Sequence, residues 1–546
     1  MLKTIPVGTE NFRKIIEENF YYVDKSLIIE ELIKNNKDVI LFPRPRRFGK
    51  SLFISMLDNF FNIETKESNK DLFKDLKISK SEYYKYFGNY PVIKLDFKSL
   101  KQDNYEVMYS AFKEMIRELY SNKKYLIDIL DEREKEIFNS FIMETADIDK
   151  YQKSIKLLSN FLYRYYNKEA IILIDEYDVP IQQGYLCSFY ENIVSFIREV
   201  FSNTLKGNNN IKFAVMTGVL RVSKESLFSD LNNVDVYSIV NKEYNEYFGF
   251  TENETKELLE YYNLELTKEV KDMYDGYNFN GVDIYNPWSI LNYANRKELV
   301  PYWINTSGNE LIMNLIRNPN DDIKVAIENL IQGKSLLFTY DEKVTFLDLN
   351  RKNSLNMIIN FFLQSGYLTL DKDNKITDEM MRAVIPNNEV KNMFANMLNY
   401  FLVEDNYLVN TLTYDFRNAF LENDKNKIEA ILNKIMLSVS FYDTKENFYH
   451  GYMLGLFTFF LNNSRYILKS NREAGSGRFD IMIESVDKKL GIIIELKITN
   501  KDMENTAKNA LKQMKEKEYY KELLLDKIEN IYEYAIVFKG KKCIVR

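Results

Sequence analysis

The clearest chemical signal in the sequence is a loop of eight residues, Arg44-Pro-Arg-Arg-Phe-Gly-Lys-Ser51. Its frame matches the phosphate-binding pattern G-x-x-x-x-G-K-[ST] at every fixed position except the first. In such a loop Gly49 lets the backbone approach phosphate oxygens, Lys50 reaches the β- and γ-phosphates, and Ser51 holds Mg²⁺ at a helix N-terminus. The spacing therefore predicts a site for the phosphates of a nucleotide and for Mg²⁺.

This loop departs from the pattern at its first position, where Arg44 stands in place of glycine. Pro45 also supplies no N–H donor, so the cradle has fewer flexible joints and one amide fewer. The four cations of the loop can compensate, because guanidinium groups bind phosphate through forked hydrogen bonds. The alternative is a basic, solvated turn. The further nucleotide-binding residues predicted in the loop are Arg46, Arg47, Phe48 and Leu52.

A pair of carboxylates, Asp175 and Glu176, follows a run of apolar residues typical of a buried strand. At the carboxyl end of such a strand we expect Asp175 to bind the water shell of Mg²⁺, and Glu176 to orient and deprotonate an attacking water. Thr217 ends the next strand and can sense the γ-phosphate, although an ordinary strand-end turn fits it equally well. Arg221 is a weaker candidate for stabilising charge, and Asp178 is expected to cap the following segment.

A second chemical constellation lies in the last hundred residues. Asp480 opens an apolar strand, and Glu495 and Lys497 lie in the next one. Period-two alternation puts Glu495 and Lys497 on one face. If the hairpin register also sets Asp480 beside Glu495, two carboxylates converge to hold one or two Mg²⁺ ions, and Lys497 can orient or help to deprotonate water. Such a site suits phosphodiester hydrolysis; the alternative is an exposed, ion-paired strand.

Two helical patterns flank this constellation. Glu446 and His450 lie four residues apart on the first and share a face, which makes Glu446 a further metal ligand or water holder and His450 a packing residue. Gln513, with Tyr519 or Tyr520, lies on the second helix. We expect that helix to pack over the strand pair and address the substrate.

Composition narrows the choice of metal and of cellular setting. His450 is the single histidine, so oxygen ligands, with Mg²⁺ or Mn²⁺, are expected at any metal centre. Cys187 and Cys543 indicate neither a disulfide framework nor a thiolate site, which favours a reducing cytoplasm. The longest apolar stretch, Tyr452–Leu461, reaches only half of the ~20 residues that a bilayer requires. The net charge of −6, from 74 Lys and Arg against 80 Asp and Glu, gives no global footprint for nucleic acid.

The elements that must position these residues begin with short β-branched runs that alternate with longer helical patterns over the first 240 or so residues. This alternation is typical of a parallel sheet flanked by helices. The strand at 170–174 is apolar throughout and should be central. The strand at 92–97 lies between the two motifs, as in P-loop proteins with an additional central strand and a catalytic glutamate. The expected strands are Val39–Phe42, Val92–Phe97, Ile171–Asp175, Phe213–Thr217 and Val236–Ile239, and Leu52–Phe61 is an expected helix.

The middle of the sequence is mostly helical from about 245 to 335, with an aromatic-rich connector at 274–279 and a helix start at Asn286-Pro287. This pattern favours a lid. A helix followed by a hairpin, the outline of a winged helix, comes next. Because it has no concentrated basic face, we interpret it as a structural connector rather than a DNA-binding module. Its expected elements are a helix at Asn356–Gly366 and strands at Tyr367–Leu370 and Ala383–Pro386.

Four motifs extend the phosphate-site signal over the first part of the chain. They are Tyr21-Tyr-Val-Asp-Lys-Ser26, Arg44-Pro-Arg-Arg-Phe-Gly-Lys-Ser-Leu52, Leu173-Ile-Asp-Glu-Tyr-Asp178 and Leu231-Asn-Asn233. Together they resemble the bacterial AAA-ATPase-like family over the first 285 residues or so. That family carries the same arginine-rich loop, so Arg44 fits its pattern. The resemblance implies a P-loop fold that binds and hydrolyses ATP.

The order of the predicted helices and strands around Asp480, Glu495 and Lys497 gives a further indication. A helix with Glu446 precedes three strands, a helix with Gln513 and a strand at Tyr532–Phe538, and two further motifs are Glu446-Asn-Phe-Tyr-His-Gly451 and Ser470-Asn-Arg-Glu473. This order is similar to the PD-(D/E)XK nuclease superfamily, in the branch fused to AAA-ATPase-like domains. The resemblance covers residues 440–546 and implies a restriction-endonuclease-like α/β domain, Mg²⁺-dependent cleavage, and nucleic acid, with DNA favoured, as substrate.

The sequence thus predicts an α/β protein of four parts: a P-loop domain at 1–245, a helical lid region at 246–335, a winged-helix-like connector at 336–435 and a PD-(D/E)XK nuclease-like domain at 436–546. The predicted function is an ATPase coupled to a nuclease, with lid movement controlling access of nucleic acid. The alternative is a nucleotide-dependent switch whose C-terminal domain binds nucleic acid or protein without cleaving. We expect a cytoplasmic protein without membrane contact and leave homo-oligomerisation open.

Overall fold

The structure is a computed structural model in which the chain divides into two compact units. The first comprises Met1–Lys297 with Leu337–Pro386, and the second comprises Glu298–Leu336 with Asn387–Arg546. The four domains predicted from the sequence divide the chain more finely, and their bounds stay predictions. The residues that the structure describes are 2–220, 234–303, 321–331, 333–341, 355–372, 380–394, 415–438, 449, 453, 456–457, 466–470, 473–474 and 477–546.

The first unit is built on the parallel sheet that the sequence predicts, in the strand order β2-β3-β4-β1-β5. All six residues of β3 are buried, and β2 and β4 pair with it on its two sides, which confirms its interior position. The strands are β1 (Val39–Pro43), β2 (Val92–Asp96), β3 (Ala170–Asp175), β4 (Ile211–Gly218) and β5 (Val234–Val236).

Two expectations about this sheet are wrong. The strand at Val92–Asp96 is not the additional central strand, because it lies at the edge of the sheet, where its exposed Lys94 and Asp96 alternate with buried residues. The strand between β1 and β3 is β4. The last strand ends at Val236 rather than Ile239, because the amide of Ser238 donates to the Asn241 side chain (2.8 Å) and the backbone turns away from the sheet.

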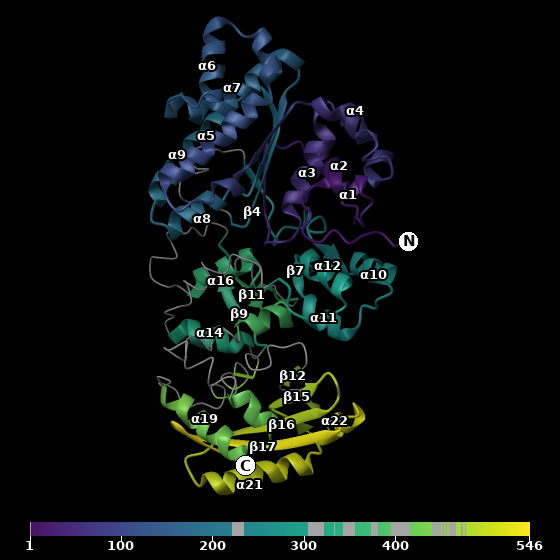
Figure 1. The fold of residues 1–546 in the computed structure, drawn as a ribbon, viewed down its shortest axis with the longest axis vertical. Coiled ribbons are helices and arrows are strands. Elements are labelled where there is room, and N and C mark those ends of the chain that lie inside the picture. Colours follow the sequence, from purple (N-terminus) through teal and green to yellow (C-terminus); the bar gives the residue numbers. More distant parts are fainter. Residues whose placement is uncertain are drawn as a thin grey trace. The chain divides into compact units, whose positions relative to one another are not determined.

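Helices cover both faces of this sheet. Figure 1 shows α1 to α4 on one side of it and α5 to α9 on the other. The longest, α7, buries residues three and four apart, among them Ile155, Leu158 and Leu162, as an amphipathic helix requires. The helices are α1 (Phe12–Glu17), α2 (Ile28–Asn35), α3 (Lys50–Phe61), α4 (Lys66–Asn69), α5 (Tyr105–Ser121), α6 (Glu132–Ile142), α7 (Ile148–Tyr166), α8 (Val179–Leu186) and α9 (Tyr190–Leu205).

The expected lid contains a small sheet, β6-β8-β7, beside its helices. The aromatic connector at 274–279 is therefore not a plain linker, because it forms β7 and pairs with β8 across a turn at Asn280 and Gly281. Both turn residues have positive φ, which an Asn-Gly hairpin turn requires. Asn286 caps α12, as predicted. The elements are β6 (Phe250–Thr251), α10 (Glu252–Tyr261), α11 (Lys268–Tyr274), β7 (Tyr277–Phe279), β8 (Val282–Tyr285) and α12 (Pro287–Arg296).

The predicted helix and hairpin of the middle region are present, and a third strand, β9, joins the far side of the hairpin. The first hairpin strand begins only at Thr369, because the amides of Tyr367 and Leu368 both bond to the Phe362 carbonyl at the helix end. The second ends at Val384, before Pro386. The elements are β9 (Leu336–Thr339), α16 (Leu355–Ser365), β10 (Thr369–Leu370) and β11 (Met380–Val384), and the second unit contains α14 (Asp321–Ile331).

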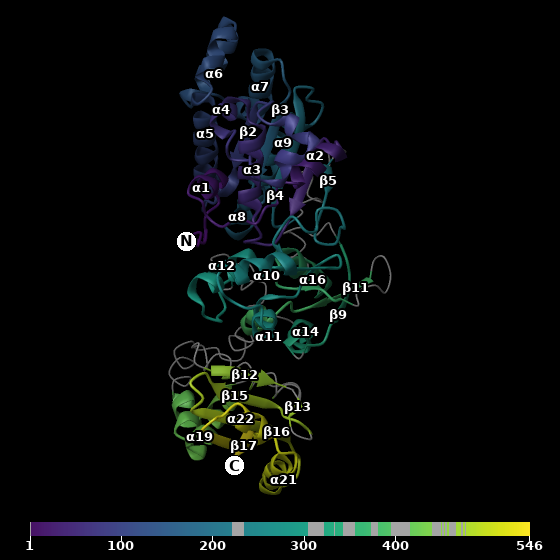
Figure 2. The same ribbon diagram turned by 90° about the vertical axis from the view of Figure 1, so that its right-hand side faces the viewer.

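The C-terminal domain in the second unit is a five-stranded sheet between helices, in the order β12-β15-β16-β17-β18. β16 and β17 are parallel, and the other neighbours are antiparallel. Figures 1 and 2 show α19 on one face and α21 on the other. Its main elements are α19 (Lys425–Ser438), β12 (Tyr466–Ser470), β15 (Ile481–Ser485), β16 (Leu490–Ile498), α21 (Met503–Glu516), α22 (Tyr520–Leu525), β17 (Asn530–Lys539) and β18 (Lys542–Val545), and a small hairpin pairs β13 (Glu473–Ala474) with β14 (Gly477–Arg478).

Alternation along β16 explains this layering. Ile492 and Ile494 face the α19 side and share a core with Leu432, whereas Ile493 faces the α21 side and packs near Met514. The α/β fold class, with a parallel sheet in the N-terminal part of the chain and a sheet domain in the C-terminal part, is confirmed. No helix among the described segments is both long and apolar enough to cross a lipid bilayer.

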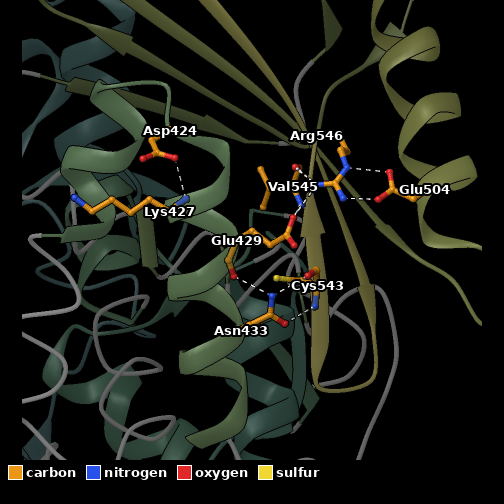
Figure 3. A network of polar contacts seen from close by, with 8 residues as sticks. All are labelled: Asp424, Lys427, Glu429, Asn433, Glu504, Cys543, Val545 and Arg546. Carbon is orange, nitrogen blue, oxygen red and sulfur yellow. Dashed lines mark hydrogen bonds and ion pairs between the residues drawn. The ribbon is translucent and has the colours of Figure 1, made fainter.

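A polar clasp joins both helices to the edge strand β18 (Figure 3). Asn433 of α19 donates to the carbonyl of Cys543 (2.8 Å) and accepts from its amide (2.9 Å), as a neighbouring strand would. Glu429 accepts from the amide of Val545 (3.0 Å) and from Arg546 (2.8 Å). The guanidinium of Arg546 also binds Glu504 of α21. The side chains of α19 thus cover backbone groups that an edge strand exposes.

Candidate active sites

The phosphate-binding loop joins β1 to α3, so that it ends at a helix N-terminus. Gly49, directly before α3, has a φ of 87°, a conformation that favours glycine. A Cβ at this position would meet no described atom of a non-neighbouring residue within 4 Å, so the space beside Gly49 is open. Ser51 and Leu52 are partly buried in the first helical turn, whose amides attract anions. The local geometry fits phosphate.

Lys50 links the two halves of the predicted phosphate site. Its buried ammonium donates to the carbonyls of Arg44 (3.1 Å) and Pro45 (3.0 Å). Burial lowers the pKa of Lys50, and the nearby carboxylates of Glu176, Asp178 and Asp175 act in the opposite direction. Residues some 125 positions apart therefore meet at one edge of the sheet, as expected where parallel strands end.

Arg44 does not belong to the phosphate cradle, and the expectation that its guanidinium compensates for the missing amides is wrong. Its side chain is fully buried and donates to the carbonyls of Pro43, Tyr237 and Tyr244. The guanidinium also lies 4.8 Å from the ring centre of Phe248. Burial lowers the pKa of Arg44 to about 9. The long side chain of Arg44 thus anchors the segment after β5.

The next three residues of the loop each contact a different neighbour. Arg46 donates to Gln182 of α8 (3.2 Å), and the guanidinium of Arg47 lies 4.3 Å from the ring centre of Trp288 on α12. Phe48 is buried against the rings of β7, with centroids 5.0 Å and 5.6 Å away. Only the backbone of Phe48 can face a nucleotide, whereas the exposed Arg47 can turn toward one.

The strand-end carboxylates differ in their surroundings. Asp175 is buried and accepts a hydrogen bond from the hydroxyl of Thr217, which therefore contacts the carboxylate in this structure. Glu176 is only partly buried and has a φ of 51°. Burial raises the pKa of Glu176, Lys50 opposes this, and the like charges of Asp175 and Asp178 add to it. A partly exposed carboxylate with a raised pKa suits a general base.

Asp178 has a place that sequence reasoning missed. It makes no capping bond to α8, so the expected cap is wrong. Instead its buried carboxylate accepts from the amides of Val219 and Leu220, both at 2.9 Å. Burial raises the pKa of Asp178. The closeness of three acids in four residues could have indicated this role. Arg221, the weaker candidate for stabilising charge, lies outside the described residues.

The carboxylate–lysine constellation lies at the junction of β15 and β16. Ile481 pairs with Ile494, so Asp480 falls opposite Glu495. The carboxylate of Asp480 accepts from the amide of Leu496 (2.8 Å). Glu495, which is 2% exposed, accepts from the ammonium of Lys497 (2.7 Å), so the two side chains share a face. The structure thus brings together the three residues that the spacing pointed to.

The helix above these strands and the turn that follows it each add a polar group. The expectation that one helix carries Gln513 and the tyrosines is wrong, because α21 ends at Glu516 and Tyr519 precedes α22. Gln513 of α21 donates to Glu495 (3.1 Å), and its side chain also bonds to Tyr519. Burial raises the pKa of Tyr519, the bond to Gln513 opposes this, and Glu495 and Asp480 add to it. Of the two tyrosines considered, Tyr519 therefore faces the site. Glu446 and His450 lie outside the described residues.

The oxygen donors of both sites fit Mg²⁺, which takes one or two protein carboxylates and completes its shell with waters and substrate phosphates. Asp480 and Glu495 would hold it in the C-terminal domain, and Ser51 with Asp175 would hold it beside a nucleotide. Within the described ranges there is no group of three or more His, Cys, Asp and Glu side chains that could hold a metal alone.

Comparison with known proteins gives distant relatives. The chain is 26% identical over 443 residues to an uncharacterized protein in the vnfD 5′ region of Azotobacter chroococcum mcd 1, covering 80% of this chain and 78% of that one. A STAND protein from Pyrococcus horikoshii with a tetratricopeptide repeat sensor is 13% identical, with a TM-score of 0.25, over 77% of this chain. The chain spans about half (53%) of that structure.

A second solved structure, Drosophila ORC bound to AT-rich DNA and Cdc6, is 7% identical over 70% of this chain and 90% of that one, with a TM-score of 0.18. The matches to protein families are specific. Residues 6–228 match the family described as predicted AAA-ATPase, and residues 444–546 match the PD-(D/E)XK nuclease superfamily. The chain therefore combines an AAA-ATPase-like domain at residues 6–228 with a PD-(D/E)XK nuclease superfamily domain at residues 444–546.

Proposed function

We propose that the chain binds and hydrolyses ATP at the loop of residues 44–51 and cleaves nucleic acid at Asp480, Glu495 and Lys497 in a Mg²⁺-dependent reaction. We also propose that the state of the nucleotide controls the cleavage. The observation that carries the nuclease proposal is the grouping of Asp480, Glu495 and Lys497 under Gln513.

In the proposed nuclease site, hydrogen bonds from neighbouring groups hold each carboxylate in one orientation. Gln513 and Lys497 hold Glu495, and the Leu496 amide holds Asp480. Mg²⁺, when bound, would polarise the scissile phosphate and lower the pKa of a water. The side chain of Lys497 is 28% exposed, so its ammonium can orient the attacking water and neutralise charge on the phosphate. Water then adds across one P–O bond, and its proton passes to the leaving oxygen.

In the ATPase site Lys50 exchanges partners. Its ammonium leaves the carbonyls of Arg44 and Pro45 for phosphate oxygens, a gain because a hydrogen bond between two charged groups is stronger than one to a neutral carbonyl. Glu176 accepts a proton from the attacking water. Thr217 keeps Asp175 in place through its hydroxyl.

A nuclease assay on the purified chain tests the first half of the proposal. Asp480→Asn and Lys497→Met should abolish cleavage of oligonucleotides with Mg²⁺ and leave thermal unfolding unchanged. Lys488→Met, in the turn at the other end of the same hairpin, is the matched control and should cleave normally. Wild-type chain that leaves DNA and RNA intact with Mg²⁺ or Mn²⁺, with and without ATP, would falsify the nuclease.

The second candidate function is a nucleotide-dependent switch whose C-terminal domain binds nucleic acid or protein without cutting. The ion pair of Glu495 with Lys497 favours it, because the pair neutralises the carboxylate without a metal. Binding of oligonucleotides without scission, in Mg²⁺ and in Mn²⁺, would support the switch over the nuclease.

A further inference from the structure

The two ends of the parallel strand pair β16 and β17 in the C-terminal sheet differ in charge. β16 and β17 run parallel, with Lys497 level with Val537, so both strands end at the same edge. The amide of Thr499 bonds to the carbonyl of Phe538 (3.0 Å) and keeps the two strand ends together. This edge carries a group of exposed lysines, which we call the basic ridge: Lys501, Lys539, Lys541 and Lys542.

The opposite edge, where β16 and β17 begin, has no such excess. Its two turns hold three lysines and three acids, which balance: Asp487, Lys488, Lys489, Asp526, Lys527 and Glu529. The acid nearest the basic ridge in sequence is Asp502, which accepts from the amide of Glu504 (3.0 Å) and so caps α21. Four lysines against this one acid leave an excess of three positive charges at the ridge.

The basic ridge continues the face that carries the reactive side chains. Lys539 lies two residues beyond Val537, so its side chain points to the same side as that of Lys497, ~7 Å farther along the strand. The ammonium of Lys539 donates to the carbonyl of Lys501 (3.3 Å), which draws the two ends of the ridge together. A chain of phosphates that passes Lys497 therefore meets these lysines next.

We propose that the basic ridge binds the sugar–phosphate backbone of a nucleic acid and lays the strand across Glu495 and Lys497. This inference rests on the proposed nuclease function and adds the surface that positions its substrate. Exposed lysines in a turn bind phosphates as point charges and read no base, so the ridge should bind nucleic acid without regard to sequence.

Binding of labelled oligonucleotides to the full chain in EDTA, over a series of salt concentrations, tests the ridge. The ridge variant combines Lys539→Ala, Lys541→Ala and Lys542→Ala, and the matched control combines Lys488→Ala, Lys489→Ala and Lys527→Ala. The plot of log affinity against log salt should become less steep by about 3 for the ridge variant, one unit for each phosphate that a lysine no longer neutralises. The control should keep the wild-type slope.

Separate arms with duplex DNA, single-stranded DNA and RNA of one sequence identify which backbone fits the ridge best. Equal slopes for the ridge variant and the wild type, or equal reductions of slope in ridge variant and control, would overturn the ridge; so would a wild-type chain that binds no oligonucleotide. Wild-type scission with an unchanged slope in the variant leaves the nuclease standing without the ridge. A reduced slope in the variant, with no scission by the wild type, leaves the ridge standing without the nuclease.

Discussion

Arg47 lies at the exposed tip of the phosphate-binding loop, with its guanidinium over the indole ring of Trp288. This contact competes with phosphate. At an exposed site such as that of Arg47, a cation–π contact contributes about 0.5–1 kcal/mol, whereas a hydrogen bond to a charged group contributes about 1.5–3 kcal/mol. We therefore expect the guanidinium of Arg47 to leave the ring of Trp288 and bind phosphate when a nucleotide is present.

We accordingly expect ATP with Mg²⁺ to shift tryptophan emission to longer wavelength, because water reaches the uncovered ring of Trp288. Fluorescence titration of the full chain measures the shift. Trp288→Phe should remove it, and Trp303→Phe, which replaces the second of the two tryptophans, should retain it. A shift that survives Lys50→Ala would show that the signal does not report on the phosphate site.

Glu176 should give ATP hydrolysis a distinctive dependence on pH. A general base must be deprotonated, and burial holds the pKa of Glu176 above that of an ordinary glutamate. The rate should therefore fall on acidification at a higher pH than a solvent-exposed glutamate would produce. Profiles of kcat against pH test this.

A neighbouring charge provides the matched variant for this profile. Asp178 contributes to the raised pKa of Glu176, so Asp178→Asn should move the acid limb to lower pH. An acid limb that stays in place in Asp178→Asn and is also present in Glu176→Gln would assign it to another group.

The reactive residues were predictable from the sequence to the extent that local rules place them. Strand alternation and hairpin register brought Asp480, Glu495 and Lys497 together from their spacing alone. Arg44 could not be read this way, because the carbonyls of Tyr237 and Tyr244 that hold it lie about 200 positions away in the sequence. Its arginine signals charge, and only the tertiary structure shows that the charge is buried.

At the scale of elements, Arg546 joins helices from opposite faces of the C-terminal sheet. It binds Glu429 of α19 and Glu504 of α21 (Figure 3). Glu429 is partly exposed and Glu504 is exposed, so solvent screens both pairs and each alone adds little. Together they should matter more than one surface pair, because they connect two helices through one strand.

Arg546→Ala should therefore lower the free energy of unfolding of this domain by about 1 kcal/mol. Urea unfolding followed by circular dichroism measures the loss. Lys512→Ala is the matched control, because it removes an exposed pair with Glu516 inside α21 and should change little. If both variants lose the same stability, the clasp adds nothing beyond a surface ion pair.

Element boundaries were predictable where a local signal decides them. Asn286 before Pro287 correctly marked the start of α12, and the Asn280-Gly281 pair was an available signal for the β7–β8 hairpin that the helical reading passed over. The edge position of β2 had no such signal. β2 lies at the edge because β4, which comes much later in the sequence, pairs between β1 and β3. No local pattern in the sequence indicates that pairing.

At the scale of the whole molecule, the proposal is a coupling between two sites in separate compact units. Coupling is a free energy, and it must be reciprocal. If bound ATP changes the affinity for nucleic acid by some factor, nucleic acid changes the affinity for ATP by the same factor. This holds whatever elements carry the effect, so it can be tested without knowing them.

The Asp480→Asn chain, expected to hold oligonucleotides uncut in Mg²⁺, allows both halves of this cycle to be measured. ATP should change the Kd of the oligonucleotide by about 5- to 150-fold, the usual range of allosteric coupling. The Kd of ATP, measured by calorimetry with and without saturating oligonucleotide, should change by the same factor. Adding Lys50→Ala should reduce the first factor to one. If both factors equal one while each ligand still binds, the ATPase and the nuclease share a chain without sharing control.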